Sequence, residues 1–202
     1  MFANNLHNNE QLQELQLKIA KGDETAFTHL YHHYYKKLFH FAKLLVRSNE
    51  IAEELVEDVF VKLWSSRSKV TEIENLTVYL YVVVKNKALN ILSSKAKDLI
   101  IAPFDFLEIA GDSFTSNPYD LLITSEMMHR MSDAIDALPP RCKMIFRLVR
   151  EDGLKYKEVA KILNISVNTI DVQMTIAVKK ICMALHIQKP GILHSHANQK
   201  NN

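Results

Sequence analysis

The chain has 202 residues, 48% of them hydrophobic and 24% charged, which is enough for one domain or two small ones. Only four glycines and five prolines are present, and this scarcity of turn formers favours helices over a sheet protein. No apolar run reaches the roughly 18 residues that a membrane-spanning helix needs. The first residues also lack the basic and apolar stretches of a signal peptide, so we expect a cytoplasmic protein.

Residues 22–94 show a nearly continuous helical pattern with short breaks. Asp23 is placed to cap a first helix, whose apolar residues recur every three or four positions as far as Leu45. Ser48 and Asn49 then interrupt the pattern. We expect residues 1–21 to be a separate N-terminal segment, followed by helices at about 23–45, 51–64 and 76–94 and a polar loop at 65–75.

A second group of helices is predicted after a break in the pattern. Residues 95–124 gather proline, glycine, serine and asparagine and carry two basic and five acidic side chains, which is typical of an acidic flexible linker. Residues 125–188 carry ten basic and seven acidic side chains, and this basic excess suits a DNA-binding module. Its helices are expected at 125–138, 141–150, 156–163 and 167–185, and residues 189–202 are expected to be a disordered tail.

The stretch LKYKEVAKILNISVNTIDVQMTIAVKKI is the most informative part of the sequence. Two helical patterns meet there across only Asn164, Ile165 and Ser166, which is the spacing of a helix-turn-helix. Asn164 tolerates a left-handed backbone at the turn, and the Ser166 hydroxyl can cap the second helix. In such motifs the second helix enters the DNA major groove, N-terminus first.

The outward face of this second helix carries residues suited to reading DNA. Asparagine and glutamine can recognise adenine edges, methyl-bearing side chains can contact thymine methyls, and lysine can reach phosphates. A bundle hairpin is the structural alternative, but it would rarely place apolar residues opposite its own core. The predicted DNA-contacting residues are Ser166, Asn168, Thr169, Val172, Gln173, Thr175, Ile176 and Lys179.

With these residues in view, the chain resembles the extracytoplasmic-function (ECF) sigma factors of RNA polymerase. The run DALPPRCKMIFRLVREDGLKYKEVAKILNISVNTIDVQMTIAVKKI is similar to their region four. The runs DETAFTHLYHHYYKKLFHFA, AEELVEDVFVKLW and YLYVVVKNKALNIL are similar to their region two. The resemblance implies an all-α protein of two small helical domains, region two at 22–94 and region four at 125–188, joined by the linker.

The resemblance also implies a mechanism and partners. Such a subunit binds core RNA polymerase and directs initiation at promoters, region four recognising the −35 element and region two the −10 element. Region two would offer the acidic residues Glu54, Glu57 and Asp58 to the polymerase, although charged rows on helices are usually only solvated faces. The residues expected at the −10 element are Tyr79, Tyr81, Lys85, Asn86, Lys87, Asn90, Arg67 and Lys69, with either tyrosine an equal candidate for the core. An anti-sigma factor is a further expected partner, one that could hold the protein at the inner membrane.

We expect neither enzymatic activity nor a cofactor, a metal or a small-molecule substrate. Cys142 and Cys182 are isolated and are expected to be reduced, largely buried thiols. His29, His32 and His33 have helical spacing but no cysteine or carboxylate beside them, which disfavours zinc. Two rival functions remain: a regulator whose N-terminal helices sense a ligand or phosphorylation, and an all-helical adaptor that does not bind DNA.

Overall fold

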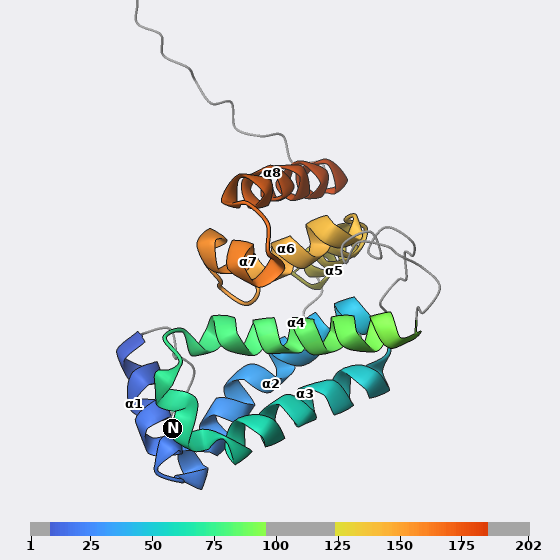
Figure 1. Ribbon diagram of the computed structural model, residues 1–202. Coiled ribbons are helices and arrows are strands. Elements are labelled where there is room, and N and C mark those ends of the chain that lie inside the picture. The colour runs from blue at the N-terminus through green and yellow to red at the C-terminus, as the bar shows by residue number, and fades with distance from the viewer. Residues whose placement is uncertain (1–8, 96–123, 186–202) are drawn as a thin grey trace, which may run out of the picture.

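The computed structural model describes residues 9–95 and 124–185, and within these ranges all regular structure is helical (Figure 1). This confirms the predicted all-α class. None of the helices in the two described ranges is both long and apolar enough to cross a membrane. The elements are α1 (Asn9–Ala20), α2 (Glu24–Val46), α3 (Asn49–Ser65), the 3₁₀ helix η1 (Arg67–Glu72), α4 (Leu76–Lys95), α5 (Thr124–Asp136), α6 (Pro140–Arg150), α7 (Tyr156–Leu163) and α8 (Val167–Ala184).

Side-chain caps begin the helices at the positions where the sequence pattern is interrupted. The Asp23 carboxylate accepts a hydrogen bond from the Ala26 amide at 3.0 Å, and the Ser48 hydroxyl accepts one from the Ile51 amide at 3.2 Å. Each cap satisfies an amide that has no partner inside its helix. The predicted start of α2 and the predicted break before α3 are both confirmed.

Helix α1 was not predicted. Its inward positions are Leu12, Gln16 and Ile19, all buried, and the glutamine in this row weakens the apolar pattern. The Gln16 side-chain amide donates to the carbonyl oxygens of Val70 and Ile73, at 2.7 and 2.9 Å. Through these bonds α1 supports η1, the 3₁₀ helix that stands where the sequence suggested a loop.

Helices α2, α3 and α4 form the body of the first helical group (Figure 1). Their inward faces bury Leu30, Leu38 and Phe41 from α2 together with apolar residues of α3 and α4. The Phe41 ring packs edge-on against the Tyr81 ring of α4, with 5.2 Å between the ring centroids. Helix α4 is therefore held from one side by this core.

The second helical group contains the predicted helix-turn-helix. Asn164 ends α7 in the left-handed conformation, with φ of 55°, and the Ser166 hydroxyl caps α8 by accepting from the Thr169 amide at 3.0 Å. Both turn features are confirmed. Behind the turn, Leu163, Ile170 and Met174 are buried and hold α7 against α8.

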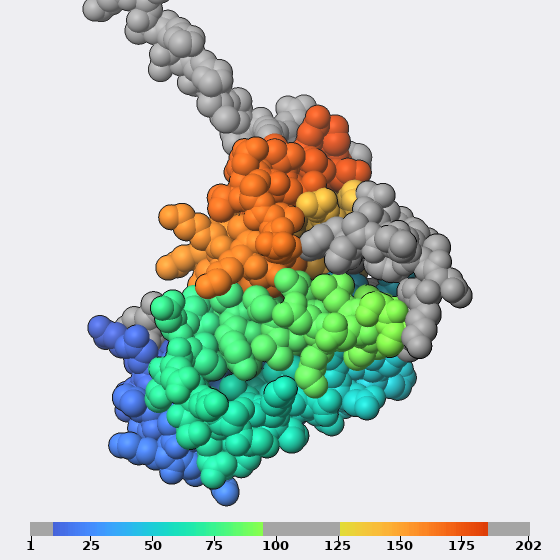
Figure 2. All heavy atoms as spheres, in the orientation of Figure 1, coloured from blue at the N-terminus to red at the C-terminus, as the bar shows by residue number. Residues whose placement is uncertain are grey.

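The two helical groups pack against each other. Helix α7 lies along α4, and α6 approaches α2, so that residues of both groups share one hydrophobic core (Figures 1 and 2). The sequence pattern had suggested two separate helical domains joined by a flexible linker. It gave no indication of how one domain is placed relative to the other. The boundaries at 22–94 and 125–188 remain predictions.

We expect Gln16→Ala to destabilise the protein by about 1–3 kcal/mol, because the carbonyls of Val70 and Ile73 lose a buried donor. Urea unfolding followed by circular dichroism measures the change. Gln13→Ala is the matched control, since Gln13 lies on the exposed face of the same helix. Equal stability of the two variants would show that the Gln16 amide does not hold η1.

Candidate nucleic-acid interfaces

One face of α8 is open to solvent and carries most of the predicted DNA-contacting residues. Its opposite face, which includes Ile170, Met174 and Ala177, is buried against α6 and α7. Val172 and Ile176 are 48% and 36% exposed, although both are apolar. In Figure 1, α8 lies on the side of α6 and α7 that faces away from α4. The exposed residues of the predicted set are Ser166, Asn168, Val172, Thr175, Ile176 and Lys179, whereas Thr169 and Gln173 are half-buried.

The N-terminus of α8 is arranged to receive an anion. The hydroxyls of Ser166 and Thr169 lie 2.8 Å apart and share a hydrogen bond, while Ser166 also accepts from the Thr169 amide. Both hydroxyls therefore serve the cap first. The remaining amides of the first turn and the positive end of the helix dipole favour a phosphate close to this end.

The predicted residues of α4 lie on two different sides of that helix. Asn86 and Asn90 are exposed, and Tyr79 is 39% exposed. The Lys87 ammonium is half-buried and pairs with the Asp58 carboxylate of α3 at 3.0 Å. The pair therefore links Lys87, which is predicted to contact DNA, with Asp58, which is predicted to contact the polymerase.

Tyr81 and Lys85 are turned toward the second helical group. Tyr81 has no exposed surface, and its hydroxyl donates to the Asp152 carboxylate at 2.7 Å. The Lys85 ammonium donates to the carbonyl oxygen of Ile162 at 2.8 Å. In this arrangement both side chains therefore face the second helical group, because residues four apart share a helix face and α7 with the turn before it covers that face. Their contact with the −10 element remains a prediction.

Burial changes the acidity of the groups at this contact. It raises the pKa of the Tyr81 hydroxyl, with further contributions from the Asp152 charge and hydrogen bond, and it lowers the pKa of the Lys85 ammonium. Burial also raises the pKa of the Asp152 carboxyl to about 6, although the Tyr81 hydrogen bond opposes the change. The ionised Asp152 carboxylate is therefore less favourable at this buried position than in water.

The residues predicted in the turn before α4 lie apart from the Tyr81 contact. Arg67 places its guanidinium 4.9 Å from the centroid of the Trp64 ring and donates to the Trp64 carbonyl oxygen at 3.2 Å. Lys69 is exposed. The 3₁₀ helix η1 packs against α1 and lies on the side of the start of α4 that faces away from α7 (Figure 1).

The acidic residues predicted to meet the polymerase lie on the outer face of α3. Glu54 and Glu57 are exposed, and Asp58 is exposed although it is paired with Lys87. The opposite face of α3 packs on α2 and α4 through Leu55, Val59 and neighbouring apolar residues. The acidic face therefore stays accessible while the two helical groups are packed together.

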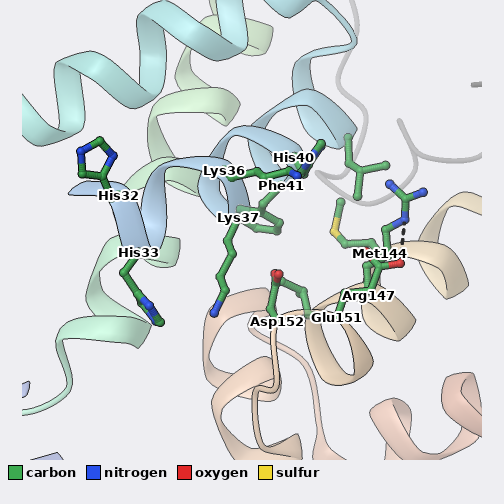
Figure 3. A pocket seen from close by; sticks show the side chains of 12 residues that line it. His32, His33, Lys36, Lys37, His40, Phe41, Met144, Arg147, Glu151 and Asp152 are labelled. Atoms are coloured by element: carbon green, nitrogen blue, oxygen red, sulfur yellow. Dashed lines mark ion pairs between the residues drawn. The ribbon is translucent and has the colours of Figure 1, made fainter. Parts of the chain in front are cut away.

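A cavity of about 450 Å³ between α2 and α6 was not anticipated from the sequence. The residues that line it include Phe41, Met144, His33, Lys37 and Asp152 (Figure 3). In Figure 3 the Lys37 side chain extends toward Asp152. The spacing of the histidines was the one sequence feature that pointed to this cavity. The opposite wall of the cavity comes from residues more than 100 positions away in the chain.

Comparison with known families matches both helical groups. The family model described as "Sigma-70 region 2" matches residues 30–98. The family model described as "Sigma-70, region 4" matches residues 128–181. The protein is similar to the ECF RNA polymerase sigma-E factor of Escherichia coli strain K12, with 27% identity over 80% of this chain and 88% of that protein. The sigma-E factor of Haemophilus influenzae is 25% identical over 80% of this chain and 89% of that protein.

Two solved structures share the fold. CnrH in complex with the cytosolic domain of CnrY gives a TM-score of 0.52 at 18% identity, covering 86% of this chain and 96% of that chain. The sigma factor RpoE in complex with the anti-sigma factor NepR from Bartonella quintana gives a TM-score of 0.55 at 20% identity, covering 81% and 98%. At these identities the likeness concerns the fold alone.

The raised pKa of Asp152 predicts a specific pH dependence of stability. The carboxyl binds its proton more tightly in the folded protein, at about 6, than at its ordinary value of 3.8. Its burial penalty is therefore absent below about pH 4, grows through the window from 4 to 6, and is full above 6. We expect the stability of the unmodified protein relative to Asp152→Asn to increase as the pH falls from 7 to 4.

Urea unfolding of both proteins at several pH values measures this difference. Tyr81, Lys37, Arg147 and Glu151 also act on the pKa of Asp152, and all four are retained in the variant, so their own titration contributes to both proteins alike. Asp171→Asn, at an exposed position on α8, controls for the loss of a carboxylate in general. A relative stability that stays constant with pH would contradict the burial of an ionisable Asp152.

Proposed function

The chain belongs to the sigma-70 family and is a promoter-recognising sigma factor of the ECF type that directs transcription initiation, and on that premise we propose which surfaces meet which partner. The second helical group reads the −35 element through α8. The first helical group binds core RNA polymerase through α3 and the −10 element through α4. The observation that carries this assignment is the exposed, mixed polar and apolar face of α8, presented by a capped helix-turn-helix.

The chemistry of the α8 face supports direct recognition of bases. Asn168 suits the donor and acceptor pair of an adenine edge, and exposed Val172 and Ile176 suit thymine methyl groups. Lys179, farther along the helix, suits a phosphate. We assign base readout to the first three residues and backbone positioning to Lys179.

At the −10 element, the exposed residues of α4 are the proposed first contacts. Tyr79 offers a ring on which an unpaired base can stack, and Asn86 and Asn90 offer amides for base edges. Lys87 is placed to contribute a cation once its pair with Asp58 opens. Tyr81 and Lys85 join this set only if α7 leaves α4.

The sigma factor itself carries out no chemistry in this proposal. Sigma factors are initiation factors without enzymatic activity of their own, and bond formation in RNA belongs to the polymerase. We also propose that the protein acts in the cytoplasm, where the polymerase and the promoter are.

An anti-sigma factor is a proposed further partner. The two solved structures with the same fold are complexes, one with the anti-sigma factor NepR and one with the cytosolic domain of CnrY. The exposed apolar residues Val172 and Ile176 suit an inhibitory protein as well as DNA. The same proposal includes retention of the protein at the inner membrane by such a partner.

Run-off transcription with core RNA polymerase, genomic promoter fragments and the full chain tests the function. We expect start sites that core polymerase alone does not produce. Asn168→Ala should weaken initiation selectively at promoters whose −35 element carries the matching base, by about 1–3 kcal/mol in binding. Lys179→Ala should weaken binding to all promoters alike. It should also lower the number of counterions released on binding, measured from the salt dependence, by about one.

Lys21→Ala, a change at an exposed lysine remote from α8, is the control for loss of positive charge. Absence of any new start site would overturn the function itself. New start sites with an Asn168→Ala variant that loses no promoter selectivity would overturn only the assignment of base readout to α8.

Charge reversal on α3 tests the polymerase surface. We expect the double variant Glu54→Lys, Glu57→Lys to bind core polymerase at least tenfold more weakly, because both carboxylates would meet a basic surface. Glu10→Lys, at an exposed acidic residue of α1, is the matched control. Pull-down with core polymerase measures assembly, and circular dichroism verifies the fold. Undiminished assembly of the double variant would refute the assignment.

A further inference from the structure

The cavity between α2 and α6 is lined by more basic than acidic side chains. Helix α2 contributes Lys36, Lys37 and three histidines, and α6 contributes Arg147 from the opposite wall (Figure 3). The acids in the lining are Glu151 and Asp152. The volume of about 450 Å³ lies within the range of roughly 300–1,000 Å³ that is usual for small-molecule sites. None of these residues belongs to the proposed DNA or polymerase surfaces, so the cavity needs an explanation of its own.

The apolar residues of the lining offer little surface to a guest. Phe41 and Leu148 are 2% exposed and Met144 is 1% exposed, because each is packed into the core. Leu44 is the one partly exposed apolar side chain among the described residues of the lining. The hydrophobic contribution to binding scales with the apolar area removed from water, and here that area is small. A ligand of this cavity is therefore held by charge, which favours a compact anion over a lipid or an aromatic molecule.

The acidity of His40 indicates that the surroundings of this cavity are positively charged. Burial lowers the pKa of its imidazole, and the charges of Arg147, Lys36 and Lys43 lower it further. The surroundings that disfavour a protonated imidazole favour an anion in the same place. Within the two described ranges, neither Lys36 nor Lys37 forms an ion pair. Both ammonium groups are therefore available to a ligand.

The two acids of the lining do not neutralise these cations. The Asp152 carboxylate accepts a hydrogen bond from the Tyr81 hydroxyl at 2.7 Å, and burial raises its pKa to about 6. The Glu151 carboxylate lies 3.7 Å from the Nε atom of Arg147, beyond hydrogen-bond distance. That buried Nε atom has no hydrogen-bond partner among the residues that the structure describes. The guanidinium of Arg147 thus retains a donor that the protein itself does not use.

We propose that this cavity binds the di- or triphosphate group of a small molecule, between Lys36 and Lys37 on one wall and Arg147 on the other. A phosphoryl group has three outward oxygen atoms and can accept from both walls, whereas a carboxylate has two oxygen atoms in one plane. Lysine and arginine are the usual phosphate-binding side chains. The site contains residues of both helical groups, so it is complete only in the packing seen in Figure 1. It does not depend on the proposed promoter contacts.

Isothermal titration calorimetry of the full chain with inorganic tripolyphosphate tests the site, at an ionic strength of about 0.15 M, which screens distant charges. We expect saturable binding of one anion per chain. Citrate, a carboxylate anion of similar charge, should bind at least fivefold more weakly. Titration with ATP without magnesium identifies the source of the phosphate group. Equal affinity for both phosphates supports recognition of the phosphate group alone, and tighter binding of ATP supports a nucleotide.

Substitutions of opposite sign locate the anion in the cavity. We expect Lys36→Gln, Lys37→Gln to weaken tripolyphosphate binding by roughly tenfold, because two attractive charges are lost. Lys21→Gln, Lys62→Gln is the matched control, since both lysines are exposed and lie outside the cavity.

Glu151→Gln should bind tripolyphosphate at least twofold more tightly, because a repulsive charge leaves the lining. Misfolding cannot produce such a gain. Glu10→Gln, at an exposed position of α1, controls for the loss of a carboxylate elsewhere, and circular dichroism verifies the fold of every variant.

Absence of saturable tripolyphosphate binding would overturn the proposal. Equal losses in the two double-lysine variants, or no gain in Glu151→Gln, would overturn its placement in the cavity. Citrate that binds as tightly as tripolyphosphate would overturn the preference for phosphate. Displacement of tripolyphosphate by random-sequence duplex DNA at equal phosphate concentration would assign the lysines to a nucleic-acid surface and overturn the small-molecule site.

Discussion

Helix α4 is packed from two directions, and the rest of the arrangement depends on this. The core of α2 and α3 holds one side of it through contacts such as Phe41 on Tyr81, and α7 covers another side. Tyr81 belongs to both contacts, since its ring packs in the first helical group and its hydroxyl bonds Asp152 in the second. The same residue therefore supports the fold of one group and the contact between the two groups.

The packing of the two helical groups leaves some of the proposed binding surfaces exposed and covers others. The reading face of α8 and the acidic face of α3 are exposed, because their helices pack through the opposite sides. The inner side of α4 is covered, while Asn86 and Asn90 on its outer side are not.

Much of the fold and part of the site were predictable from particular residues. The caps at Asp23 and Ser166 and the left-handed Asn164 follow from local chemistry, and each is confirmed. Ser48 caps α3 where the sequence pattern predicted only a break. Helix α1 was missed because Gln16 occupies an inward position, which a pattern of apolar residues alone does not recognise. Most of the exposed face of α8 follows from its helical periodicity, although Thr169, which was expected to point outward, is half-buried.

The sequence by itself determined the helices other than α1 and η1, the turn of the helix-turn-helix and the family, since these depend on residues close together in the chain or on the order of two recognisable blocks. Only the tertiary structure decided that Tyr81 and Lys85 face the second helical group. Tyr81 and Asp152 are 71 positions apart, and helical periodicity carries no information on which distant surface a helix face will meet. Their partners were fixed by packing in space, where burial of apolar surface and pairing of polar groups are settled together.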